Sequence, residues 1–305
     1  MRVGYVLVLC VAVLCMAVGV GSGAPLSAQT ATTGMPLLEC SGLPCVDVTV
    51  AGDRHLKMLL DTGNANSVLD RTVAEAMGIT LQPVNGPDGK PYPGYASGTV
   101  PKIRVGDAEL GDLEMVVVEL KSSIGKGEMP AADGALAYTA FKGRVLTIDY
   151  KNHRVNISGV LKADAPCPQS CGTITNPTFG KKGPPIVVTT GFRLNGKPLT
   201  MQVDTLYEGT MLIYPTSVHK LGLTDQQSSS MVRKFPFTDG GVEMIEGAAT
   251  QEGFGDEVLR RNVALYFATR KVHLPDGMFD GTVGNELFLG HVLTLDFHAN
   301  RFWMS

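Results

Sequence analysis

The chain of 305 residues contains one unit twice, and this duplication constrains its fold more than any other feature. Residues 133–154, DGALAYTAFKGRVLTIDYKNHR, match residues 280–301, DGTVGNELFLGHVLTLDFHANR, at a constant shift of 147 (280 − 133). Nine of these 22 positions are identical, whereas ordinary composition would give roughly one or two. So regular a match predicts two similar halves related by an approximate twofold axis.

Each half also contains an apolar run that is interrupted by an Asp-Thr pair. Residues 58–69 read MLLDTGNANSVL, and residues 199–213 read LTMQVDTLYEGTMLI. The two aspartates, Asp61 and Asp204, are 143 positions apart (204 − 61), so the register of the duplication changes only by the length of a loop. A carboxylate where an apolar strand ends is buried or half-buried, and it must be paired, neutralised or put to use.

The pattern of both halves is typical of β-strands. Short alternating or apolar runs are bounded by turn residues, and the chain holds 36 Gly and 18 Pro. One short helix is expected after each Asp-Thr pair, at residues 72–78, where Thr72 and Glu75 have capping-box spacing, and at residues 216–222. We therefore predict an all-β, bilobal fold of two β-barrel-like halves with one short helix each.

Four segments are expected along the chain. A signal peptide would occupy residues 1–28, a first lobe residues 37–157 and a second lobe residues 186–305. Residues 158–185 are rich in Gly, Pro, Lys and polar residues, which is typical of an exposed linker.

Residues 1–28 have the features of a secretory signal peptide: an early arginine, an uncharged stretch over residues 3–20, and small residues toward Ala28. The stretch is also just long enough to cross a membrane, so a retained anchor is the alternative. We expect cleavage, because the run ends in small residues and not in a positive cluster. The mature protein would then be periplasmic or extracellular, without further membrane contact.

The mature chain keeps four cysteines, and an even number in an exported protein favours two disulfides. Three pairings are possible, and the local ones are favoured because each pair brackets a short polar turn. A zinc site is the alternative, which is less expected because the two pairs lie far apart in sequence. The histidines show no metal-binding spacing either, so we expect no metal and no cofactor. The four residues are Cys40, Cys45, Cys167 and Cys171.

Composition argues against several other classes of protein. The chain has 26 Lys and Arg against 29 Asp and Glu, and it contains no basic run interleaved with aromatic residues. Nucleic acid is therefore not an expected partner. No serine or cysteine lies in a nucleophile-elbow context, and no glycine-rich phosphate loop is present.

Asp61 and Asp204, one from each half, would meet across the twofold axis. Two carboxyl groups within about 3 Å of each other cannot both ionise easily, so they share one proton. The ionised partner can take a proton from water while the protonated partner hydrogen-bonds the attacked carbonyl, which gives peptide hydrolysis favoured in acid. Asp133 and Asp280 recur in the same way, but Asp-Gly before a strand is a common turn signal.

An apolar strand that leads into Asp-Thr-Gly, followed later by an apolar pair before a small residue, resembles the retropepsin and pepsin-like aspartic proteases. The resemblance covers essentially the whole mature chain. It implies that Asp61 and Asp204 are the catalytic pair and that Thr62 and Thr205 lock the two loops together through their hydroxyl groups. It also implies that Gly63 lets the backbone close around the first carboxylate.

Two positions depart from the family pattern. Leu206 stands where the family has Gly, and Ala137 stands where the second half has the smaller Gly284. If the backbone at Leu206 needs a positive φ, leucine is costly there; otherwise its N–H can still serve the acid pair. The sequence leaves this question open.

The family also uses a hairpin flap that often carries an aromatic residue near its tip. Residues 84–100, VNGPDGKPYPGYASGTV, lie at a suitable distance after Asp61 and are rich in turn residues. The resemblance implies Tyr92 or Tyr95 as the flap aromatic, and a plain exposed loop is the alternative.

These observations predict an exported, monomeric aspartic endopeptidase that acts on extended peptides or unfolded proteins. The first alternative is a catalytically inactive relative that binds peptides or a protein partner between the two lobes. Leu206 and Ala137 favour that alternative. A structural module whose acids are satisfied internally is the second.

Overall fold

The computed structural model describes residues 34–86, 89–120, 132–159, 170–178, 184–223, 229–233, 242–268 and 278–305. Residues 33–305 form one compact unit. The expected signal peptide, Cys167 and much of the expected linker lie outside the described residues. Within the described ranges, every helix is too short or too polar to span a membrane.

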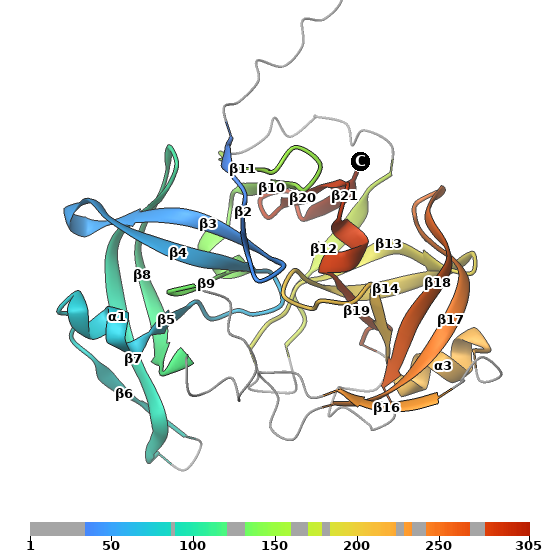
Figure 1. Ribbon diagram of the computed structural model, residues 1–305, viewed down its shortest axis with the longest axis horizontal. Helices are drawn as coiled ribbons and strands as arrows, with labels where there is room; N and C mark the ends of the chain where they lie inside the picture. The colour runs from blue at the N-terminus through green and yellow to red at the C-terminus, as the bar shows by residue number, and fades with distance from the viewer. Residues whose placement is uncertain are drawn as a thin grey trace, which may run out of the picture. The chain divides into compact units, whose positions relative to one another are not determined.

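Most of the described residues lie in β-strands, and the strands form two sheets (Figure 1). The strands of the first sheet all come from the first half of the chain. Their spatial order is β2-β3-β4-β9-β5-β8-β7-β6. The strands are β2 (Leu38–Cys40), β3 (Leu43–Val50), β4 (Arg54–Asp61), β5 (Val68–Asp70), β6 (Gln82–Asn85), β7 (Pro91–Val105), β8 (Ala108–Val118) and β9 (Gly134–Ala137).

The second sheet combines strands from both halves. Its order among the described residues is β1-β11-β10-β20-β21-β12-β13-β14-β19-β15-β18-β17-β16. The strands from the first half are β1 (Met35–Pro36), β10 (Val145–Asp149) and β11 (Arg154–Ser158). Those that follow are β12 (Gly172–Thr175), β13 (Val188–Leu194), β14 (Lys197–Asp204), β15 (Met211–Ile213), β16 (Ser229–Arg233), β17 (Val242–Phe254), β18 (Glu257–Ala268), β19 (Gly281–Gly284), β20 (Val292–Asp296) and β21 (Arg301–Met304).

The duplication is visible in strand pairing. β4 runs parallel to β9 with Asp61 opposite Ala137, and β14 runs parallel to β19 with Asp204 opposite Gly284. Both pairings have the same register, because Asp204 follows Asp61 by 143 positions and Gly284 follows Ala137 by 147, as in the sequence repeat. The all-β, bilobal fold predicted from the sequence is confirmed.

Among the described strands, the pair β10 and β20 joins the two halves. β10 and β20 are antiparallel neighbours, and Thr147 lies opposite Thr294. These threonines are the same residue of the repeat, since 294 − 147 = 147, and their hydroxyl oxygens are 3.4 Å apart. The approximate twofold axis therefore passes between them.

Short helices follow the Asp-Thr turns, as predicted. α1 (Arg71–Ala76) begins after Asp70, whose side chain accepts a hydrogen bond from the backbone N–H of Thr72, so the N-cap is Asp70 and the expected Thr72 cap is wrong. Asp70 fits the cap because it ends a strand and its carboxylate reaches the free N–H groups of the first turn. α3 (Pro215–Leu221) ends at Gly222.

Three shorter turns of helix complete the described elements. They are η1 (Ala51–Asp53), η2 (Tyr138–Phe141) and α4 (Asn285–Phe288). η2 and α4 follow β9 and β19, so they occupy equivalent places in the two halves. Each places an apolar side chain, Phe141 or Phe288, in the core with no exposed surface. Burial of these rings fixes the segment behind each Asp-Thr turn.

Candidate active site

Asp61 and Asp204 end two strands whose last residues before the acids are buried. Leu60 and Val203, the residues just before the acids, have no exposed surface. Asp61 is 9% exposed, and Asp204 is partly exposed. The apolar residues therefore drive each strand into the core, and each acid lies at the point where its strand leaves it.

Thr62 and Thr205 lock the two turns together. The backbone N–H of Thr62 donates to Oγ1 of Thr205 at 3.1 Å, and the N–H of Thr205 donates to Oγ1 of Thr62 at 3.1 Å. Each hydroxyl then donates across the axis, Thr62 to the carbonyl of Val203 and Thr205 to the carbonyl of Leu60. Both threonines are fully buried. This reciprocal arrangement is the one that the family resemblance implied.

Gly63 lies directly against the second acid. A Cβ atom built on Gly63 would come within 2.3 Å of Cγ of Asp204, which is far inside contact distance. Glycine is therefore required here for close approach rather than for an unusual φ. The carboxylates are also anchored by their own turns, because the N–H of Gly63 donates to Oδ1 of Asp61 at 3.0 Å and the N–H of Leu206 donates to Oδ1 of Asp204 at 2.9 Å.

Burial raises the pKa of both acids above the usual aspartate value. The pKa of Asp61 is raised well above that value, first by burial and then by the neighbouring charge of Asp204. Burial also raises the pKa of Asp204. Backbone N–H groups, including those of Gly63 and Leu206, oppose both shifts by stabilising the carboxylates. The pair is therefore built to hold a proton that a lone exposed aspartate would lose.

The two departures from the family pattern are accommodated. The φ of Leu206 is not positive, so leucine is not strained there, and its N–H still serves Asp204. Ala137 is fully buried, and its N–H donates to Oγ of Ser67 at 3.0 Å. By contrast, a Cβ on Gly284 would come within 2.2 Å of the carbonyl oxygen of Tyr207. Glycine is thus required at this position in the second half, whereas the first half has room for alanine.

Sequence reasoning missed a polar chain behind the first acid. Nε2 of Gln202 donates to the carbonyl of Gly63 at 3.1 Å. The hydroxyl of Thr282 lies 3.3 Å from Oε1 of Gln202 and 2.8 Å from the hydroxyl of Tyr214. Burial raises the pKa of Tyr214 to about 12. A glutamine inside the otherwise apolar run before Asp204 was the available signal.

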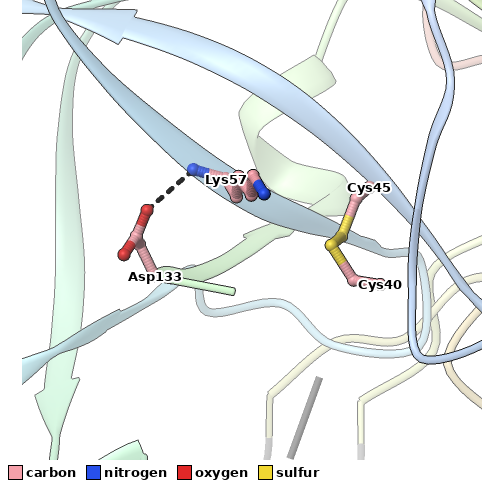
Figure 2. The surroundings of a disulfide bond; sticks show 4 residues. All are labelled: Cys40, Cys45, Lys57 and Asp133. Carbon is pink, nitrogen blue, oxygen red and sulfur yellow. Dashed lines mark hydrogen bonds between the residues drawn. A yellow bond between two sulfur atoms is a disulfide. The ribbon is translucent and has the colours of Figure 1, made fainter. Parts of the chain in front are cut away.

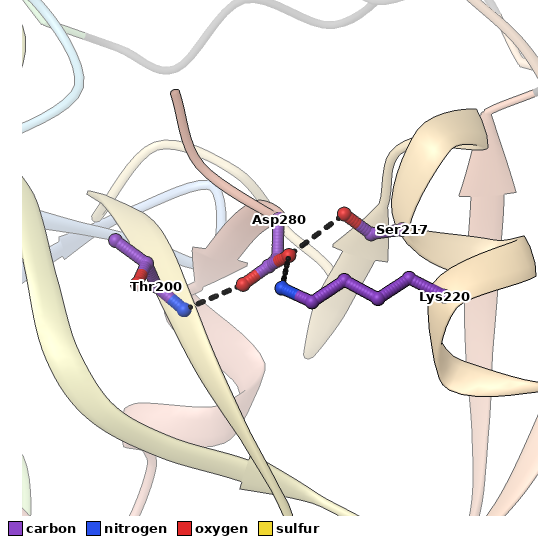
Figure 3. Close-up of polar contacts among 4 residues, drawn as sticks. All are labelled: Thr200, Ser217, Lys220 and Asp280. Atoms are coloured by element: carbon purple, nitrogen blue, oxygen red, sulfur yellow. Dashed lines mark hydrogen bonds and ion pairs between the residues drawn. The ribbon is translucent and has the colours of Figure 1, made fainter. Parts of the chain in front are cut away.

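Asp133 and Asp280 brace the strands that carry the acids. Figure 2 shows Oδ2 of Asp133 accepting the backbone N–H of Lys57 at 2.8 Å. Figure 3 shows the equivalent contact, in which Oδ2 of Asp280 accepts the N–H of Thr200 at 2.8 Å. Oδ1 of Asp280 also accepts hydrogen bonds from Ser217 and Lys220. Their carboxylates are therefore occupied by structural contacts.

The Cys40–Cys45 disulfide is confirmed, and it closes the turn between β2 and β3 (Figure 2). Cys171 is also disulfide-bonded, but its expected partner Cys167 lies outside the described residues. No three His, Cys, Asp or Glu side chains gather as metal ligands would in the part of the chain that the structure describes.

Tyr92 and Tyr95 lie on β7, which pairs with β6 to form a hairpin. They are 48% and 43% exposed, and their rings meet edge to face with centroids 4.9 Å apart. The expected flap region thus contains a hairpin with two exposed aromatic rings. Its role as a flap stays a prediction.

Comparison with known proteins supports the resemblance. Residues 46–138 match the aspartyl protease family. No curated protein matches the chain. Solved structures similar to this chain include conglutin gamma from lupine seeds, with 10% identity, coverage of 89% of this chain and 94% of that one, and a TM-score of 0.47.

Two further solved structures are proteases. The aspartic proteinase from Irpex lacteus shares 10% identity over 89% of this chain and 96% of that one, with a TM-score of 0.46. The retropepsin-like aspartic protease from Rickettsia conorii shares 16% identity over 35% of this chain and 75% of that one, with a TM-score of 0.26. The match over residues 46–138 confirms the resemblance to the aspartic protease family that the sequence predicts.

Proposed function

We propose that this protein is an exported aspartic endopeptidase that hydrolyses peptide bonds with a water activated by Asp61 and Asp204. The observation that carries the proposal is the meeting of two acids from opposite halves, in which Asp204 lies so near the first turn that Gly63 has no room for a Cβ atom. Burying two such groups is costly, and the reciprocal threonine contacts hold them together nonetheless. Such an arrangement is typical of a reactive site.

The reaction follows from one shared proton. The ionised carboxylate takes a proton from water, and the water oxygen attacks the carbonyl carbon of the peptide. The protonated carboxyl group hydrogen-bonds the carbonyl oxygen and donates its proton as the tetrahedral intermediate forms. Collapse of the intermediate breaks the C–N bond. The nitrogen receives a proton from one carboxyl group and leaves as an amine, while a hydroxyl group of the intermediate returns its proton to the other carboxylate, which restores the shared proton and releases a carboxylic acid.

Export and the form of the substrate belong to the same proposal. The signal-like residues 1–28 and the three disulfide-bonded cysteines, Cys40, Cys45 and Cys171, suit an oxidising compartment, periplasmic or extracellular. The substrate is an extended peptide or an unfolded protein, which the exposed hairpin carrying Tyr92 and Tyr95 would help to hold. The protein acts as a monomer, because one chain supplies both acids.

Cleavage of an unfolded protein by the mature chain between about pH 3 and 7 tests the proposal, since a shared-proton pair titrates in this range. We expect activity that peaks in acid and falls at least about 1,000-fold in Asp61→Asn and in Asp204→Asn. Asp256→Asn, at an exposed turn, is the matched control and should keep wild-type activity.

A folded wild-type chain that cleaves nothing at any pH would refute the proposed activity. Retention of an unfolded substrate without cleavage would instead support the inactive relative, in which the same residues bind peptide. Leu206, in place of the glycine of the family, is the feature that favours this second candidate.

A further inference from the structure

The side chain of Leu206 marks a difference between the two Asp-Thr turns. Gly63 and Leu206 are equivalent positions of the repeat, since 206 − 63 = 143. The leucine side chain is partly buried and packs against a cluster formed by Cys40, Cys45, Leu59 and Ala135. We call this group the disulfide cluster. Leu206 thus adds an apolar contact between the second turn and the first half.

The hairpin that carries the disulfide also reaches the second half at its tip. Ser41 and Gly42 form the tip, and both have positive φ. The carbonyl of Gly42 accepts a hydrogen bond of 2.8 Å from Nδ2 of Asn285. The backbone N–H of Asn285 donates in turn to the carbonyl of Tyr207 at 2.7 Å. Asn285 therefore ties the hairpin tip to the turn that contains Leu206 and Tyr207.

The first turn is held by different chemistry. The equivalents of Leu59 and Ala135 are Gln202 (59 + 143) and Thr282 (135 + 147). Gln202 binds the carbonyl of Gly63, and Thr282 contacts Gln202. At these equivalent positions the Asp61 turn is held by side-chain hydrogen bonds, whereas the Asp204 turn has the apolar contact of Leu206 with the disulfide cluster.

We propose that the hairpin closed by Cys40 and Cys45 positions the Asp204 turn through Leu206 and Asn285, and that it thereby sets the spacing of the two acids. Leu206 and Asn285 are positioning residues, because each acts through the turn and not on the substrate. This inference rests on the proposed function. It also implies that opening the disulfide weakens catalysis before it unfolds the protein.

The first test compares Leu206→Ala with Leu259→Ala, which truncates another partly buried leucine of the second half at the edge of the main core. We expect Leu206→Ala to lower kcat by about tenfold or more, as small misplacements of reacting groups do, with KM changed by less than about twofold. Leu206→Met should restore most of kcat, because it refills the apolar contact. Leu259→Ala should leave kcat unchanged.

The second test opens the hairpin. The double variant Cys40→Ala/Cys45→Ala should lower kcat in the same direction as Leu206→Ala while its circular dichroism stays native. Combining it with Leu206→Ala should add little, because both changes release the same turn. Additive losses, or full activity without the disulfide, would overturn the proposal.

The third test does not require activity. Carboxyl titration of the protein labelled with ¹³C-aspartate reports on the acid pair directly, with Asp61→Asn and Asp204→Asn used for assignment. Leu206→Ala should shift the titration of the pair, and Leu259→Ala should not. An inactive wild-type protein whose pair still responds to Leu206→Ala would refute the proposed function and keep the positioning role. Identical titrations in both variants would refute the positioning role.

Discussion

At the scale of single residues, close approach determines what each position tolerates. Gly63 and Leu206 are equivalent in the repeat, yet only Gly63 faces a carboxylate at a distance that excludes a side chain. The same contrast holds for Gly284 and Ala137. The two halves share a backbone plan and differ in which positions are crowded.

Gly63→Ala should abolish most activity while the protein still folds. Its Cβ atom would lie 2.3 Å from Cγ of Asp204, so the acids must move apart. Overpacking of this kind costs about 1–3 kcal/mol of stability, and a displacement of about 1 Å lowers the rate about 100-fold. Kinetics and urea unfolding measure both effects. Gly159→Ala, where a Cβ meets no atom within 4 Å, is the control.

Glu252 is a second buried acid, and it predicts a pH-dependent stability. Its side chain has no exposed surface. Burial raises its pKa from 4.5 to about 7. A hydrogen bond from Thr210 and the charge of Arg260 oppose this shift, whereas the charge of Glu286 adds to it. Glu252 occupies the position that Ile103 holds in the first half, judged by the matching hairpin registers.

A raised folded-state pKa means that stability is full below pH 4.5 and falls as pH rises through about 7. The loss from this group approaches about 3 kcal/mol, because one pH unit is worth about 1.4 kcal/mol. Glu252→Gln should remove this part of the pH dependence of the unfolding free energy, measured in urea at pH 5 and pH 8. Glu257→Gln, an exposed neighbour on β18, should leave it in place. A wild-type slope in Glu252→Gln would contradict the prediction.

At the scale of elements, Asp133 and Asp280 tie the acid-bearing strands to the strands beside them. β4 and β14 each receive one such carboxylate contact, on the N–H groups of Lys57 and Thr200. Asp280 is 6% exposed and has three partners, whereas Asp133 is more exposed. β14 is thus held more firmly by Asp280 than β4 is by Asp133.

Asp280→Asn should destabilise the protein by about 2 kcal/mol, since hydrogen bonds to charged groups are each worth about 1.5–3 kcal/mol and some are retained by the amide. Asp133→Asn should cost less than half as much. Urea unfolding of the two variants makes the comparison. Equal losses would show that Ser217 and Lys220 contribute nothing to the brace.

Local sequence patterns predicted many of the strands and helices and their equivalence in the two halves. The repeat predicted the equivalence of β4 with β14 and of β9 with β19, and turn residues predicted the short helices. The N-cap of α1 was missed because Asp70 and Thr72 both suit a cap, and only the course of β5 decides between them. The packing of Leu206 was not predictable, since it depends on a hairpin more than 160 positions away in the chain (206 − 45).

At the scale of the whole molecule, the halves are joined by sheet and site together. β10 and β20 share backbone hydrogen bonds across the axis, and Thr62 and Thr205 repeat the connection at the acids. The pairing of the two acids could be predicted from the sequence because the repeat implied an axis. The pairing of β10 with β20 across the axis could not be predicted, because the repeat does not indicate which strands of the two halves pair with each other.

The two halves should therefore unfold together. Ile103→Ala removes a fully buried side chain from the first half and should cost about 2–5 kcal/mol. Trp303, the single tryptophan, lies on β21 in the second half, so its fluorescence follows that half. We expect Ile103→Ala to lower the urea midpoint measured by Trp303 fluorescence by as much as the midpoint measured by circular dichroism. An unchanged tryptophan transition would show that the halves unfold separately.

The contrast between Gly63 and Leu206 has a consequence for ancestry. In an assembly of two identical chains, both positions would carry the same residue. Leucine at both would collide with a carboxylate, and glycine at both would leave the disulfide cluster without its partner from the other subunit. The two positions are therefore best served by different residues, which a tandem chain permits because each copy can change by itself.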